Sequence, residues 1–200
     1  VGIISRNPVA GNVRLVEAMV AILRHEDFYR TGTFAAPELG VHAGWIALAD
    51  TFADQQVFQN ETGDVALLFC GECFADPEIK GQLRRNGHVF SDAGGAWLTH
   101  LYEDRGEDFC GDLNGLFSGL LIDRRRQTVF LFNDRYGIER IYWHQTAEAF
   151  YFASEAKALL RILPALREFD SEGVAHFLAF GSTPAGRTLF RGVNLLPGGS

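Results

Sequence analysis

Four short runs of β-forming residues follow one another in the second half of the chain, with turn signals between them. They are Leu116–Ile122, Thr128–Phe132, Arg140–His144 and Ala149–Ala153. Short strands spaced in this way predict a meander, in which each strand lies beside the next. The basic run Arg124–Arg126 falls between the first two runs and is interpreted as a solvated hairpin turn rather than a binding patch.

Helical segments surround these strands. Apolar residues recur with helical spacing over residues 12–24, and Asn12 is a plausible cap. Further helices are predicted over Pro77–Arg85, Gly95–Arg105, Glu155–Leu163 and Glu172–Phe180, the last two capped by Ser154 and Asp170. Short β-type runs also fill residues 40–74, with a hairpin turn at Glu61–Asp64. Two blocks of strands with helices around them indicate an α+β layered fold rather than alternating βαβ units.

The composition excludes several classes of function. The chain has 200 residues, 47% of them apolar, which is enough for a proper core. Its net charge of −7 argues against a nucleic-acid partner, because phosphate binding needs a basic face. No apolar run approaches about 18 residues and no signal peptide is recognised, so no membrane contact is expected. Three cysteines are no disulfide framework, which favours a reducing compartment such as the cytoplasm.

Several motifs of the second half resemble those of one family. They are Leu113–Phe117, Asn133–Ile138, Phe152–Leu159, Thr188–Gly192 and Leu196–Gly198. In sequence and order they are similar to the N-terminal glutaminase domain of asparagine synthetases, a class II glutamine amidotransferase domain of the N-terminal-nucleophile type. Most of these residues read as structural. Gly137 suits a turn with positive φ, and Asp134 with Arg135 is interpreted as a structural ion pair.

The resemblance implies a four-layer α/β/β/α sandwich with two antiparallel sheets. Residues 1–186 would form the glutaminase-like domain, and residues 187–200 would be a linker toward a C-terminal synthetase domain. In the family that domain uses ATP and Mg to adenylate a carboxylate, and it carries a Ser-Gly-Gly-x-Asp-Ser loop that this sequence lacks. The chain is therefore expected to be the N-terminal part of a longer protein, with no cofactor of its own. The resemblance implies two partners, its own synthetase domain and, because dimers are common in the family, a second copy of the chain.

The first residue decides the expected chemistry. In the family a cysteine precedes the Gly-Ile pair, its thiolate attacks the side-chain amide of glutamine, and its own α-amine serves as the base. Here Val1 precedes Gly2 and Ile3, and valine has no nucleophilic atom. We therefore predict that the chain has no catalytic residue for glutamine hydrolysis.

Other glutamine-binding positions are also altered. The family's arginine for the substrate α-carboxylate is replaced by Trp45, whose indole offers a single neutral donor. The family's Asn-Gly-Glu reads Cys70-Gly71-Glu72, so the amide that stabilises the oxyanion is lost while the glycine and the carboxylate remain. The aspartate for the substrate ammonium falls on Gly94, and Asp92 would need a shifted loop to replace it.

The segment Cys70-Gly71-Glu72-Cys73 allows two other interpretations. It follows a predicted strand and precedes a predicted helix, as a redox pair does, but the cis-proline that such sites use has no candidate at a suitable distance. A zinc site would need two more ligands, and Cys110, His88 and His100 are scattered along the sequence. Two small free thiols are the favoured interpretation, and no metal site is predicted.

Two classes of function remain. The intact protein would be an ATP-dependent ligase that forms an amide or other C–N bond, with ammonia from solution or an amine as nucleophile. Alternatively, the domain would be a binding or regulatory module with a remodelled pocket. In both cases Val1 and Trp45 predict an apolar cleft that closes or accepts an apolar group, with Glu72 turned to a backbone N–H or to solvent. The sequence beyond Ser200 would discriminate between the two classes.

Overall fold

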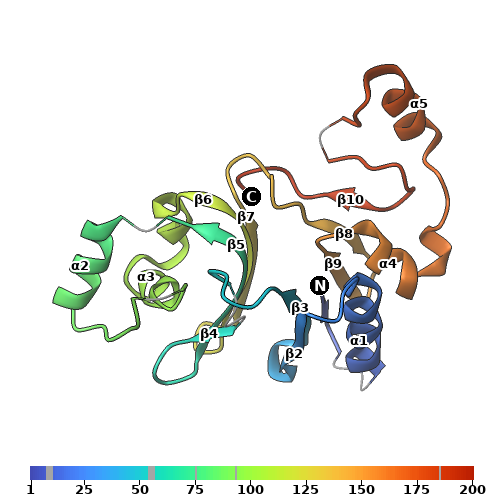
Figure 1. Cartoon of the computed structure of the whole chain (residues 1–200). Coiled ribbons are helices and arrows are strands. Elements are labelled where there is room, and N and C mark those ends of the chain that lie inside the picture. Colours follow the sequence, from blue (N-terminus) through green and yellow to red (C-terminus); the bar gives the residue numbers. More distant parts are fainter. Residues whose placement is uncertain (8–10, 54–56, 75, 93, 185) are drawn as a thin grey trace.

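Two antiparallel sheets face each other, and helices cover their outer faces (Figure 1). The computed structural model describes residues 1–7, 11–53, 57–74, 76–92, 94–184 and 186–200. One sheet has the strand order β10-β8-β9-β1-β3-β2 and the other the order β4-β5-β6-β7. The first sheet contains β1 (Gly2–Ser5), β2 (Arg30–Ala36), β3 (Val41–Ala47), β8 (Tyr142–Gln145), β9 (Ala149–Ala153) and β10 (Asn194–Leu195). The second contains β4 (Val57–Gln59), β5 (Val65–Cys73), β6 (Gly115–Asp123) and β7 (Thr128–Asn133).

Helices form the two outer layers. The helices of the described chain are α1 (Gly11–Leu23), α2 (Pro77–Arg85), α3 (Trp97–Arg105), α4 (Ala156–Ile162) and α5 (Ser171–Phe180), of which α5 lies apart from these layers. Short 3-10 turns lie at Pro37–Leu39, Gly106–Asp112 and Pro164–Leu166. Helices α1 and α4 pack on the first sheet, and α3 packs on β4 and β5 of the second. No helix of the described residues combines the length and the apolar character needed to cross a lipid bilayer.

Three apolar clusters fill the three spaces between these layers. Leu67, Phe69 and Trp97 belong to the cluster between the second sheet and α3, whereas Ile3 and Met19 belong to the cluster under α1 and α4. The third cluster lies between the sheets and includes Ala36, Val41, Ala66, Leu120 and Phe152. Neighbouring residues of β5 belong to different clusters because strand side chains alternate between faces. The predicted four-layer α/β/β/α sandwich is confirmed.

The helix starts differ in detail from the sequence predictions. Asn12 lies inside α1, and its side-chain amide donates to the Ser5 hydroxyl over 3.0 Å, so it ties the helix to β1 rather than capping it. Glu155, not Ser154, stands at the N-cap of α4. Asp170 occupies the N-cap of α5, but its side chain makes no capping hydrogen bond. Its carboxylate lies 3.6 Å from the Arg187 guanidinium instead.

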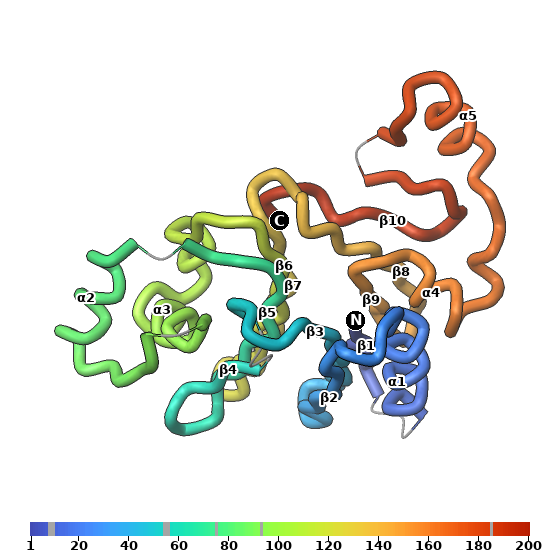
Figure 2. The backbone as a smooth tube through the Cα atoms, in the orientation of Figure 1, coloured from blue at the N-terminus to red at the C-terminus, as the bar shows by residue number. Residues whose placement is uncertain are grey.

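The four predicted strands of the second half exist, but they do not form one meander. β6 pairs with β7 in one sheet, and β8 pairs with β9 in the other. The chain crosses between the sheets over residues 134–141, which Figure 2 traces from β7 to β8. Sequence patterns missed this crossing because local residue preferences mark strands and turns, while the choice of sheet depends on distant partners.

Asp134 organises the crossing. It is fully buried, and its carboxylate accepts backbone N–H bonds from Tyr136, Ile138 and Glu139 at 2.9–3.2 Å. Burial opposes its ionisation, but the hydrogen bonds that it accepts outweigh this effect and lower the pKa of the carboxyl. The predicted ion pair with Arg135 is wrong, because none of the ion pairs between described residues joins the two. Gly137, with a φ of +64°, confirms the predicted positive-φ turn.

The last residues return to the body of the domain. β10 pairs with β8, and the Ser200 carbonyl accepts a hydrogen bond from the Asn133 N–H at 3.1 Å. The role of residues 187–200 as a connection to a further domain stays a prediction.

Candidate functional site

A cleft of about 400 Å³ lies where the start of β1 meets β3 and β5. Its walls come from both sheets and from α1, and most of the lining side chains are apolar. Of the positions compared with the family, Val1, Trp45, Cys70, Gly71 and Glu72 line this cleft together. The structure therefore assembles five of the six positions from three separate strands or strand ends, as the resemblance implies.

Val1 is held at the edge of the cleft as an extension of β1. Its nitrogen donates to the Gly44 carbonyl at 3.0 Å, and its carbonyl accepts from the Gly44 N–H at 2.9 Å. Its side chain packs with the apolar cluster under α1. Burial lowers the pKa of the Val1 α-amine to about 6. The position keeps the backbone placement of a strand end but presents only two methyl groups.

Trp45 belongs to β3, and its ring lies over the neighbouring strand β2. It pairs with Gly32 of β2, and a Cβ at Gly32 would stand only 2.4 Å from the Trp45 ring. The Trp45 indole therefore occupies the space that a side chain at position 32 would fill. The aromatic ring contributes apolar surface to the cleft and no cationic group.

Cys70 faces the cleft from β5, opposite Ser118 of β6. Burial raises the pKa of the Cys70 thiol, and the nearby Glu139 carboxylate raises it further. The Ser118 hydroxyl and the Gly71 backbone act in the opposite direction but do not cancel the shift. The thiol is therefore protonated at neutral pH and is a weak nucleophile.

Gly71 and Glu72 follow Cys70 along β5. Gly71 has a φ of +95°, and a Cβ there would stand 2.1 Å from the Leu116 carbonyl oxygen, so only glycine fits. Glu72 is exposed at the cleft, which agrees with the predicted turn toward solvent.

Gly94 and Asp92 do not reach the cleft. Gly94 has a φ of +67° and lies against Phe52 and Phe58. The Asp92 carboxylate accepts from Arg84 at 2.6 Å on the surface beside α2. Asp92 therefore does not replace the family's ammonium-binding aspartate in this structure.

Two polar residues of the cleft escaped the sequence analysis. Ser118 looked like an ordinary strand residue, and Glu139 followed a turn motif that read as structural. Burial and the nearby Asp134 carboxylate raise the pKa of Glu139. With Glu72, the lining thus holds two carboxylates, and no lysine or arginine is among the described residues that line it. The cleft is apolar, as predicted, but it has not closed.

The two cysteines of the Cys70–Cys73 motif do not form a redox pair. Both lie inside β5 rather than before a helix, and both are free thiols. Cys70 faces the cleft, whereas Cys73 belongs to the apolar cluster on the α3 side. Opposite faces of one strand keep the two sulfur atoms apart.

His88 and His100 are separated in the sequence, but the structure brings them together. The loop after α2 brings His88 beside His100 of α3, with ring centroids 5.0 Å apart. Glu103 of the same helix lies next to both rings, and no cysteine joins this group. Helical spacing links His100 to Glu103 three residues later, but the loop contact of His88 leaves no mark in the local sequence.

Comparisons with known proteins agree with this geometry. A family model described as a glutamine amidotransferase domain matches residues 1–200. Glutamine-hydrolysing asparagine synthetase 2 of Bacillus subtilis is 32% identical over 126 residues, which cover 62% of this chain and 17% of that protein. The glutamine-hydrolysing asparagine synthetase of Zea mays is 32% identical over 117 residues, 57% of this chain and 20% of that protein. The chain thus spans about a fifth of the length of these relatives.

Solved structures confirm the fold. The glutamine phosphoribosylpyrophosphate amidotransferase of B. subtilis, solved with ADP and GMP, superposes with a TM-score of 0.62 at 17% identity, over 80% of this chain and 42% of that one. A structure described as the allosteric regulatory enzyme of purine biosynthesis gives a TM-score of 0.61 at 16% identity, over 81% of this chain and 43% of that one. The family model and the asparagine synthetase relatives show that the chain belongs to the glutamine amidotransferase domains of the asparagine synthetase family.

Proposed function

We propose that this chain is the N-terminal domain of an asparagine-synthetase-like protein that forms an amide or other C–N bond with ATP, and that the domain itself does not hydrolyse glutamine. The proposal that the domain does not hydrolyse glutamine rests on the residue at the nucleophile position. Val1 is placed at the cleft as a strand end, but its side chain has no atom that could attack an amide.

The charges of the cleft also oppose glutamine binding. Free glutamine carries an α-carboxylate, which needs a cationic or multiply donating partner when it leaves water. The described cleft residues supply Glu72 and Glu139, with Trp45 where the family has arginine. A third carboxylate placed beside these two would be repelled rather than held.

Cys70 does not replace the missing nucleophile. Its thiol lies in the cleft, but its raised pKa keeps the thiolate fraction low at neutral pH. It also stands at the position of the family's oxyanion amide, so its use as a nucleophile would leave no side-chain donor in that role.

The exposed side chains of α5 support the proposal that a further domain packs against this one. Helix α5 lies outside the four layers (Figure 1). Its side chains Phe177, Leu178 and Phe180 are 47%, 80% and 75% exposed. A run of exposed apolar side chains on one helix is typical of a contact surface, and we assign it to the synthetase domain that would use ATP and Mg. Three free cysteines fit a cytoplasmic setting.

The nitrogen source of the intact protein tests the ligase proposal. The full-length protein is incubated with ATP, Mg and candidate carboxylates, with either ammonium or glutamine as nitrogen donor, and AMP formation is measured. We expect formation of AMP and of the amide product with ammonium, or with an amine in its place, and no product when glutamine is the sole nitrogen donor. A glutamine-hydrolysing asparagine synthetase serves as the positive control. Product formation with glutamine as sole donor would contradict the proposal.

A second candidate function rests on Glu72 and Glu139. An apolar cleft with two carboxylates suits a ligand with an amine and an apolar body, so the domain would bind such a ligand as a regulatory module. Calorimetric titration with simple alkylamines and arylamines tests this alternative. Binding that is lost in Glu72→Gln and Glu139→Gln would favour it.

A further inference from the structure

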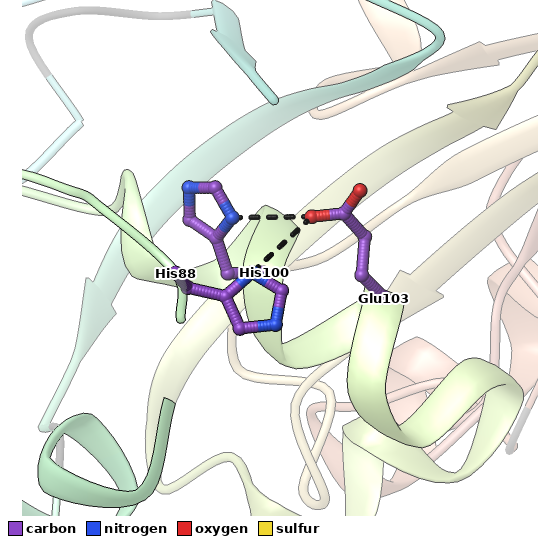
Figure 3. A group of neighbouring side chains, drawn as sticks. All are labelled: His88, His100 and Glu103. Atoms are coloured by element: carbon purple, nitrogen blue, oxygen red, sulfur yellow. Dashed lines mark hydrogen bonds and ion pairs between the residues drawn. The ribbon is translucent and has the colours of Figure 1, made fainter. Parts of the chain in front are cut away.

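We propose that His88, His100 and Glu103 form a binding site for one divalent transition-metal ion of the zinc type. The site lies on the α3 side of the second sheet, away from the cleft. Figure 3 shows both imidazole rings directed at the same carboxylate oxygen.

The three ligand atoms have the spacing that such an ion needs. Glu103 Oε2 lies 3.1 Å from His100 Nδ1 and 3.8 Å from His88 Nδ1. All three atoms lie within 4.8 Å of one another. Zinc bonds of about 2.0–2.1 Å with tetrahedral angles place ligand atoms roughly 3.3 Å apart. Small side-chain rotations would bring the observed triangle to that size.

The second nitrogen of His88 is already oriented. His88 Nε2 lies 2.9 Å from Asp104 Oδ1, and the Asn86 amide donates to the other oxygen of the same carboxylate at 2.7 Å. When Nε2 donates its proton to Asp104, the neutral ring turns the lone pair of Nδ1 toward Glu103. A carboxylate behind a histidine ligand fixes the tautomer and raises the basicity of the ligand in metal sites.

The two oxygens of the Glu103 carboxylate have different partners. Oε1 accepts from the Asn60 amide at 2.8 Å and lies 3.5 Å from the Arg125 guanidinium. Oε2 is left to the two histidines. In the neutral tautomer of His88, two acceptors then face each other across 3.8 Å, and a cation between them would relieve this opposition.

The ligands are largely shielded from solvent. The side chains of His100, Glu103 and His88 are 4%, 17% and 19% exposed. Glu61 Oε2, on the turn before β5, lies 3.9 Å from His100 Nδ1 and is the candidate fourth ligand. An ion here would join this turn to the loop after α2 and to helix α3. We infer a structural role for it.

The donor set selects the ion. Two imidazole nitrogens and one or two carboxylates suit zinc and its neighbours, whereas Mg²⁺ and Ca²⁺ prefer oxygen ligands alone. Co²⁺ is a useful probe, because it takes the same ligands and gives a visible absorption band that depends on coordination geometry.

The test uses the full chain after treatment with a chelator. Titration with Co²⁺ should give a visible band that saturates at one ion per chain, and Zn²⁺ should displace it. Zn²⁺ at about a hundredfold excess over its Kd should raise the Tm by several degrees. Glu103→Gln, which keeps an acceptor for Asn60, should abolish the band. Asp104→Asn should weaken Zn²⁺ binding about 10–100-fold.

His25→Ala is the matched control, because His25 is 55% exposed and pairs with Glu155 of a different region. It should bind Co²⁺ as the wild-type chain does. Absence of the band and of the Tm rise in the wild-type chain would overturn the proposal, and would leave only ion pairs of protonated histidines. Equal binding by wild type and Glu103→Gln would also overturn it.

Discussion

Val1 and Gly44 exchange two backbone hydrogen bonds, of 3.0 and 2.9 Å, which extend the pairing of β1 with β3 by one residue. A Cβ at Gly44 would stand 3.4 Å from a Val1 methyl group, and Val16 and Val20 of α1 lie beside the same point. The position that holds the nucleophile in the family is thus a packing position here. Its side chain helps to cover a glycine between a sheet and a helix.

This packing makes Gly44 intolerant of a larger residue. In Gly44→Ala the new methyl would stand 2.5 Å from Val20 and 2.8 Å from Val16, so α1 must shift. We expect a loss of about 1–3 kcal/mol in the free energy of unfolding, measured by urea denaturation. Gly111→Ala is the control, since nothing lies within 4 Å of its Cβ. Equal stability of the two variants would contradict the observed packing.

The Cys70 thiol should react slowly with alkylating agents. Its pKa is raised, so at pH 7–8 its thiolate fraction is below that of an ordinary cysteine, and the rate should climb as the pH rises above the usual thiol range. Glu139→Gln removes one cause of the shift and should speed the reaction of Cys70 with iodoacetamide, followed by peptide mass spectrometry. Asp92→Asn, on a remote surface carboxylate paired with Arg84, should change nothing. A Cys70 that reacts faster than free cysteine at pH 7 would contradict this environment.

Asp134 should be costly to replace. In Asp134→Ala three partly buried N–H groups of the crossing turn lose their acceptor, which we expect to cost about 1–3 kcal/mol. Because its folded pKa lies below the ordinary value of 3.8, the carboxylate stabilises the fold above that pH, and this contribution is lost as the pH falls below it. Chemical denaturation at a series of pH values between about 2 and 7 measures both the cost of the substitution and its dependence on pH.

Arg135→Ala is the control for Asp134, because the sequence interpretation paired the two residues. It should change the unfolding free energy by about 0.5 kcal/mol or less, as at an ordinary surface position. A loss of unfolding free energy similar to that of Asp134→Ala would support the ion pair and contradict the explanation that Asp134 stabilises the turn through its backbone hydrogen bonds.

Cys70 and Cys73 should respond differently to serine. Cys73 is 4% exposed in the apolar cluster under α3, so Cys73→Ser places a hydroxyl there and should cost about 1–3 kcal/mol. Cys70→Ser faces the cleft and should be nearly neutral. Thermal melts of both variants should be the same under reducing and oxidising conditions. A wild-type melting temperature that rises only on oxidation would support a disulfide and contradict the strand geometry.

The parts that sequence predicted well are local ones. The apolar spacing of α1, the turn at Gly137 and the strand residues of β5 follow from side-chain periodicity and backbone preference. The family motifs also placed Trp45 and Cys70 in one cleft, which no local pattern could do. Contacts between distant segments escaped, as with Glu139 in the cleft and His88 beside His100. Such contacts depend on how the layers pack against each other, and the periodicity of side chains along one segment does not predict that packing.

The most direct test of the account is glutamate release from glutamine by the purified chain. With Val1 at the nucleophile position and carboxylates as the only charged side chains of the described cleft lining, we predict no release above the buffer control. Val1→Cys alone should remain inactive, because the carboxylate, ammonium and oxyanion contacts are still missing. Turnover by the wild-type chain would contradict the account, and turnover by Val1→Cys would show that the cleft still binds glutamine.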